Sequence, residues 1–187
     1  MGEVMKIKIS ELKRHLKEYD QTELIQLIVE LSKINKDVQN YLSSKFLGDE
    51  AVEELFTFAR KQIQNEFFPE KGHGKLRLSD AKKTIKTFEQ TTGDKQRTVD
   101  LMLFYVELGV EFTNTYGDID ASFYTNVGNM YEKVVSICDD EEEYYHTFAG
   151  RLEKVVRDTV DVGWGFHDYF CDCYYSLQWL DDEEDEN

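Results

Sequence analysis

The fold is decided by residues 100 to 124, DLMLFYVELGVEFTNTYGDIDASFY, because no other helix-length segment carries so many apolar side chains. A segment this apolar must be covered by other parts of the chain, so we expect it to form the central helix, from about Lys95 to Tyr116. Gly117 and Asp118 follow where the apolar run ends, and a glycine in that place is typical of a helix C-terminus.

Polar residues within the central helix fall on one narrow stripe. At about 100° per residue, four polar side chains share a single face: Asp100, Glu107, Glu111 and Asn114. Either this stripe faces solvent, or it is buried and its carboxylates need a metal ion, a cation or a shared proton. The candidate ligands for a metal ion are Glu107, Glu111, Asp118, Asp120 and His167.

A second polar group opens the predicted last helix. His167 and Asp168 follow a Gly-Trp-Gly turn, and a histidine beside carboxylates suits a metal site or an acid–base pair. The alternative is a histidine that hydrogen-bonds the backbone at a helix start. An enzyme would need this group to meet the central stripe, with candidate catalytic residues Glu107, Glu111, Asn114, His167 and Asp168. No HExxH, paired CxxC or GxSxG motif occurs, so no catalytic or metal-binding residue is assigned and no cofactor is predicted.

Helical spacing recurs along the rest of the chain. Further helices are predicted over residues 10–19, 20–34, 37–46, 50–68, 79–91, 121–138, 139–162 and 166–180. Asp20 and Glu23 form a capping box, Ser10, Ser79 and Asp120 are further N-caps, and the short connections favour antiparallel neighbours. We therefore predict an all-α fold, a multi-helix bundle or irregular helical-hairpin array of eight or nine helices around the central helix. The alternative is a helical-repeat solenoid, although no fixed repeat period is found.

We expect residues 1–180 to form a single all-helical domain. Within it, residues 1–68 form helical hairpins, 69–97 a basic loop and helix, and 98–180 the C-terminal core. Residues 181–187, DDEEDEN, form an acidic tail whose composition predicts disorder.

Charge is unevenly distributed along the 187 residues, whose net charge is -16. Residues 69–97 carry 8 basic against 4 acidic side chains, whereas residues 98–187 carry 4 against 22. The overall negative charge argues against general binding of nucleic acid or anionic membranes. The basic segment 71–97 contains the anion-binding candidates Lys71, His73, Lys75, Arg77, Lys82, Lys83 and Lys86. Two alternatives for these cations are an ordinary solvated face and an internal clamp on the acidic C-terminal half.

The sequence also bears on location. The start, MGEVMKIKIS, lacks the apolar run of a signal peptide, and no apolar stretch approaches the roughly 20 residues of a membrane span. Three cysteines without disulfide spacing fit a reducing compartment. We therefore expect a cytoplasmic protein that does not associate with membranes, and the oligomeric state stays open.

Three segments resemble one known family. They are KLRLSDAKKTI at 75–85, DLMLFYVELGVEFTNTYGDID at 100–120 and GWGFHDYFCDCYYSL at 163–177. With the helical ISELKRHL, they are similar to a family of uncharacterised, mainly bacterial, all-helical proteins known as a domain of unknown function. The resemblance implies one family unit across the chain except its acidic tail. It implies no activity and no site residues.

A non-enzymatic protein–protein interaction or adaptor domain is the leading functional hypothesis. The missing catalytic motifs, the charge asymmetry and an aromatic last helix favour it. One alternative is a small metal-dependent hydrolase using the carboxylate and histidine cluster. The other is anion or nucleic-acid binding through the basic segment, where the net charge disfavours nucleic acid.

Overall fold

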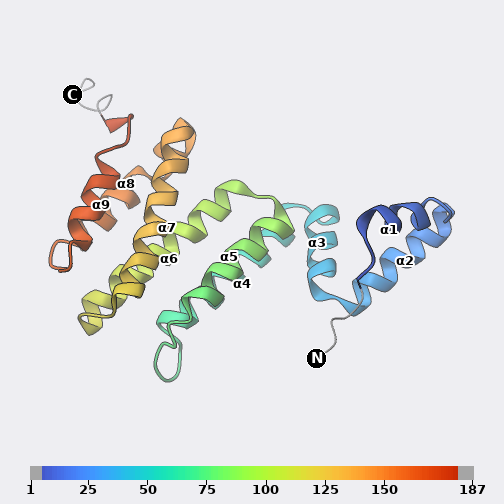
Figure 1. Cartoon of the computed structure of the whole chain (residues 1–187), viewed down its shortest axis with the longest axis horizontal. Coiled ribbons are helices and arrows are strands. Elements are labelled where there is room, and N and C mark those ends of the chain that lie inside the picture. Colours follow the sequence, from blue (N-terminus) through green and yellow to red (C-terminus); the bar gives the residue numbers. More distant parts are fainter. Residues whose placement is uncertain (1–5, 181–187) are drawn as a thin grey trace. The chain divides into compact units, whose positions relative to one another are not determined.

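The computed structural model describes residues 6–180, which form nine α-helices and no β-strand (Figure 1). The helices are α1 (Ile9–Leu16), α2 (Gln21–Ile34), α3 (Lys36–Phe46), α4 (Asp49–Phe67), α5 (Leu78–Thr92), α6 (Lys95–Tyr116), α7 (Ala121–Asp140), α8 (Glu142–Asp158) and α9 (Phe166–Tyr174). The predicted all-α fold around a central helix is confirmed. The predicted acidic tail, 181–187, lies outside the described residues.

Contacts within the chain group it into two units, with the division after Ala51. In the first unit, α2 packs on α3. The capping box predicted at the start of α2 is present, because Glu23 N–H donates to Asp20 Oδ1 and Asp20 N–H donates to Glu23 Oε2, each at 2.8 Å. No side chain of α1, α2 or α3 is fully buried.

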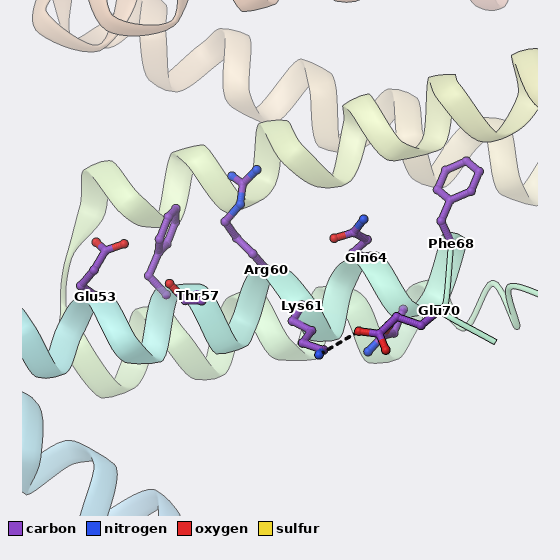
Figure 2. A pocket seen from close by; sticks show the side chains of 9 residues that line it. Glu53, Thr57, Arg60, Lys61, Gln64, Phe68 and Glu70 are labelled. Carbon is purple, nitrogen blue, oxygen red and sulfur yellow. Dashed lines mark ion pairs between the residues drawn. The ribbon is translucent and has the colours of Figure 1, made fainter.

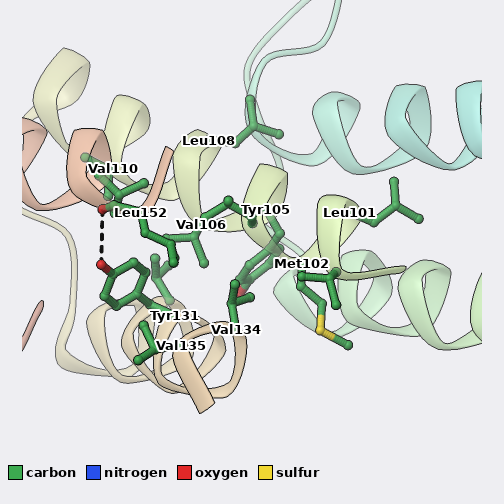
Figure 3. Packing of buried hydrophobic residues seen from close by; sticks show 14 of the residues in the cluster. Leu101, Met102, Tyr105, Val106, Leu108, Val110, Tyr131, Val134, Val135 and Leu152 are labelled. Atoms are coloured by element: carbon green, nitrogen blue, oxygen red, sulfur yellow. Dashed lines mark hydrogen bonds between the residues drawn. The ribbon is translucent and has the colours of Figure 1, made fainter. Parts of the chain in front are cut away.

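The second unit is built around α6, which packs against α5, α7 and α8. Figure 3 shows Val106 and Val110 of α6 on the side of Tyr131 and Val134 of α7 and Leu152 of α8, whereas Leu101 and Leu108 point away from α7. At the centre of this layer, the fully buried Tyr131 of α7 donates from its hydroxyl to the carbonyl oxygen of Leu152 in α8, at 3.1 Å. The apolar part of α6 therefore lies in the core of this unit.

Two glycines allow helices of the second unit to approach closely. A Cβ placed on Gly109 of α6 would lie 2.7 Å from Cγ2 of Val127 in α7. A Cβ on Gly128 of α7 would lie 2.9 Å from Cε1 of Tyr169 in α9. Both distances are shorter than normal carbon–carbon contacts, so a larger residue would displace Val127 or the helices at Gly109 and the Tyr169 ring at Gly128.

Three local predictions need correction. The last helix ends at Tyr174 rather than at residue 180. Beyond it, the chain folds back onto the end of α7, where Gln178 N–H donates to Asp139 Oδ1 at 2.8 Å and Trp179 Nε1–H donates to the Cys138 carbonyl oxygen at 3.1 Å. These contacts hold the segment out of a continuing helix.

The serine caps are the other two corrections. Helix α5 begins one residue before Ser79, and α1 begins one residue before Ser10, so both serines lie inside their helices rather than capping them. Neither helix has a side-chain cap at its N-terminus.

Candidate functional site

The polar stripe of α6 faces arginines from α4 and α8. Arg151 binds Glu107 with both ends of its guanidinium group, from Nε to Oε1 at 2.7 Å and from Nη2 to Oε2 at 2.8 Å. Asp100 Oδ1 accepts hydrogen bonds from Arg151 Nη1 at 3.1 Å and from Arg60 Nη1 at 2.9 Å. The result is one chain of ion pairs that links α4, α6 and α8.

This chain of ion pairs is half-buried, with about a third of each side chain exposed. Burial by itself lowers the pKa of Arg151, but the hydrogen bonds to Glu107 and the charges of both carboxylates outweigh it, so the pKa is raised. Arg60 also stacks on Phe104, with Cζ 3.8 Å from the ring centroid. The cation that a buried carboxylate stripe requires is thus supplied by two arginines.

The remaining residues of the predicted carboxylate cluster lie in separate environments. Glu111 is exposed, and Asn114 donates from Nδ2 to a carbonyl oxygen at the end of α8 at 2.7 Å. Asp118 accepts a long hydrogen bond, 3.4 Å, from the hydroxyl of Tyr124. Asp120 caps α7, as predicted, by accepting from an N–H of its first turn at 2.9 Å. The structure therefore does not bring these four side chains onto one centre.

His167 is held by hydrogen bonds at the start of α9. Its Nδ1 lies 2.9 Å from Oγ1 of Thr159, and that hydroxyl donates its only hydrogen to the Val156 carbonyl oxygen at 2.7 Å. His167 Nδ1 must therefore be the donor, and Nε2 lies 3.5 Å from the Sγ atom of Cys171. Burial, followed by the charges of two nearby aspartates, raises the pKa of Cys171, so this thiol stays protonated at neutral pH.

The predicted enzyme site requires the polar stripe of α6 and the start of α9 to meet, but no direct polar contact between the described residues joins them. Between residues 6 and 180, no hydrogen bond or ion pair joins His167 or Asp168 to the stripe of α6. Across the same residues, no group of three or more histidine, cysteine, aspartate or glutamate side chains is arranged to hold a metal ion. The hydrolase hypothesis stays a prediction.

The basic segment divides into two parts. Arg77 binds the buried Glu66 of α4 with two hydrogen bonds, at 3.0 Å and 2.6 Å, and these bonds raise the pKa of Arg77. Arg77 therefore clamps the loop internally, although onto α4 rather than onto the acidic C-terminal half. Lys71, His73 and Lys75 project from this loop into solvent.

Lys82 and Lys86 of α5 line a groove that the sequence did not reveal. Its other wall is α7, which contributes Asn126, Met130 and Lys133, and its volume is about 450 Å³. The predicted candidate Lys83 is exposed and lies outside the lining. No sequence pattern connects α5 with residues more than 40 positions later, so the α7 wall could not have been found before the fold was known.

A larger hollow of about 700 Å³ runs along α4 and is shown in Figure 2. Its charged side chains are neutralised by carboxylates or cations nearby. Lys61 pairs with Glu70 at 3.0 Å, and Glu53 pairs with an arginine of α6 at 3.2 Å. Arg60, which also lines the hollow, belongs to the chain of ion pairs described above. This groove therefore offers no unbalanced charge to a ligand.

Exposed apolar side chains distinguish the first unit. The large ones are Ile7, Ile9, Tyr19, Ile25, Ile28, Val29, Leu31, Ile34, Tyr41, Phe46 and Leu47. At about 100° per residue, the apolar side chains of α2 cover an arc of roughly 220°, about twice that of an ordinary surface helix. No fold-stabilising or ion-pair role within residues 6–180 accounts for these exposed apolar side chains.

Taken together, the fold and these surfaces define an acidic, multi-helix protein with surface grooves and with exposed apolar side chains on its N-terminal helices. The chain belongs to a family described as "Family of unknown function (DUF6155)", whose model matches residues 7–177. No curated protein and no solved structure matches the chain. Within the described part of the chain, no helix combines the length and the apolar character needed to cross a membrane.

Proposed function

We propose that this protein is a non-enzymatic, cytoplasmic interaction module that binds a partner protein through the apolar faces of its N-terminal helices. One observation carries the proposal: no side chain of α1, α2 or α3 is fully buried, and these helices expose large apolar side chains. Contiguous apolar surface left in water costs about 25 cal/mol per Å², and such surface marks interaction sites.

The outer face of α2 has the spacing of a helix that docks on a partner. Ile25, Ile28 and Val29 lie at positions i, i+3 and i+4, and they are 56%, 48% and 40% exposed. Helices with anchors at these intervals commonly seat in an apolar groove or against another apolar helix. We therefore expect the partner to present an apolar groove or helix face to α2.

The test changes this face without changing the helix. In the double variant Ile25→Lys/Ile28→Lys, partner binding should be lost, because two ammonium groups would have to be buried in the interface. The melting temperature should change by less than about 2 °C, since exposed positions away from special features contribute within about ±0.5 kcal/mol. The measurement is affinity capture from native cells, followed by the dissociation constant of the purified partner.

The matched control is Thr22→Lys/Gln26→Lys, which adds the same charge at exposed polar positions of α2. This variant should bind the partner as the wild type does. A fall in melting temperature of more than about 5 °C for the isoleucine variant alone would show that the chain itself covers this face. In that case the proposal is wrong.

A further inference from the structure

Three lysine ammonium groups line the groove between α5 and α7. Lys82 and Lys86 lie one turn apart on α5, and Lys133 faces them from α7. Glu89 is the one carboxylate among the described residues of the lining. The groove is thus positively charged, within a chain whose net charge is -16.

These lysines differ from most other cations of the second unit, although Lys71, Lys75 and Lys83 also lack an ion pair with any described residue. Carboxylates neutralise most of those cations, which include Arg60, Lys61, Arg77, Lys95, Arg97, Arg151, Lys154 and Arg157. By contrast, Lys86 and Lys133 form no ion pair with any described residue, and Lys82 contacts the neutral Asn126. Like charges one helical turn apart repel each other mildly, so an anion between them would relieve an unfavourable arrangement.

The amide of Asn126 fixes Lys82 before any ligand arrives. Asn126 Nδ2 donates to the Ser122 carbonyl oxygen at 2.7 Å, so its Oδ1 is turned toward the ammonium group of Lys82. Asn129 lies exposed at the rim of the same groove and offers another N–H donor. A lysine already held in place loses less conformational entropy on binding, which favours affinity.

The floor of the groove is apolar. It consists of the buried Ile85 and Met102 and the half-buried Met130. Methionine side chains adapt their shape to what binds them, and they are common on surfaces that accept varied peptides. The combination suits a ligand with carboxylates on the outside and an apolar side chain pointing inward.

We propose that this groove binds a short acidic peptide segment of another protein, with its carboxylates on the three lysines and an apolar side chain on the methionine floor. Lysine ammonium groups act as point charges, and each can pair with a single carboxylate of such a segment. A long nucleic acid would meet the negative charge of the whole chain, whereas a short acidic segment meets mainly the local lysines. The groove shares no residue with the N-terminal helices, so either proposal can fail alone.

The probe is a synthetic nine-residue peptide, three repeats of Glu-Leu-Glu, titrated into the full-length chain in 50 mM salt by isothermal calorimetry. The variant Lys86→Gln/Lys133→Gln should raise the dissociation constant about tenfold, as the loss of two exposed charge pairs predicts. The control Lys71→Gln/Lys83→Gln removes the same charge from exposed positions outside the groove and should raise it less than about twofold. All four positions are exposed, so the melting temperatures should be unchanged.

A second variant tests the floor independently of charge. Met130→Gln should weaken the Glu-Leu-Glu peptide about fivefold, as loss of a few methylene contacts predicts, and should leave a nine-residue polyglutamate unaffected.

Any of three results would overturn the proposal. The first is an equal loss in the control and groove variants. The second is an oligonucleotide of matched charge that binds more tightly than the peptide and is lost in the groove variant. The third is a carbodiimide cross-link from Lys86 or Lys133 to residues 181–187 of the same chain, which would make the occupant internal.

Discussion

Gly109 determines how close α6 and α7 can lie. Its missing side chain leaves room for Val127, which is fully buried and packed on every side. The substitution Gly109→Ala should therefore lower the free energy of unfolding by about 1–3 kcal/mol, as overpacking does in other cores, even though alanine favours helix formation. Urea denaturation followed by circular dichroism measures this change.

Gly150 is the matched comparison, since it lies within α8 and a Cβ there would meet no atom within 4 Å. Gly150→Ala should raise the free energy of unfolding by about 0.5–1 kcal/mol through the helix preference alone. If both glycine variants were stabilised alike, the contact between α6 and α7 would not depend on Gly109.

Among the elements, α8 is tied to α6 by ion pairs that all involve one arginine, Arg151. The substitution Arg151→Met should cost about 2–3 kcal/mol, because it removes charged hydrogen bonds and leaves Glu107 half-buried without a cation. On the same helix, Arg157 pairs at the surface with Glu153 at 2.8 Å. Arg157→Met should therefore cost no more than about 0.5 kcal/mol. Thermal and urea unfolding of both variants provide the comparison.

A double variant separates the arginine's packing from its charge. Arg151→Met/Glu107→Gln should recover part of the lost stability, because it also removes the carboxylate left without a partner. If Arg151→Met and the double variant had equal free energies of unfolding, then water or another cation would stabilise the Glu107 carboxylate as well as Arg151 does.

Local chemistry explains which parts of these elements could be predicted. The capping residues Asp20 and Asp120 each accept from an N–H group three positions later, so neighbouring residues are enough to predict these helix starts. The end of α9 depends instead on contacts of Gln178 and Trp179 with α7, about 40 positions earlier. A helical pattern alone continues through that segment, so the predicted end was wrong.

In the candidate sites too, features within one helix could be predicted, whereas contacts between helices could not. Helical spacing correctly placed Asp100 and Glu107 on one face of α6, but Arg151 follows them by 51 and 44 residues. Lys133 likewise follows the lysines of α5, Lys82 and Lys86, by more than 40 residues. Such pairings are decided by how the helices pack, and no periodicity within one helix contains that information.

For the whole molecule, the unequal burial of the two units predicts unequal stability. Opening α1, α2 or α3 exposes only half-buried side chains, whereas opening α6 exposes twelve that are fully buried. In native-state hydrogen exchange, amides of the first three helices should exchange at least about 100-fold faster than those of α6, because local opening there costs little free energy. Mass spectrometry of the exchanging protein measures both groups together.

Addition of a bound partner should then slow exchange in α2 and leave α6 unchanged. Equal protection of α2 and α6 in the isolated protein would contradict the prediction. It would also count against the interaction proposal, because the apolar face would already be covered.

The chain of ion pairs around Asp100 has a consequence for the newly made protein. Asp100 is synthesised after its first partner, Arg60, but Glu107 must wait for Arg151, which follows it by 44 residues. At about 5–20 residues per second, translation would take roughly 2–9 s to supply that arginine. During this interval α6 carries an uncompensated carboxylate next to apolar side chains that α7 and α8 have yet to cover. A ribosome that stalls between these codons would therefore leave a nascent chain suited to chaperones and proteases.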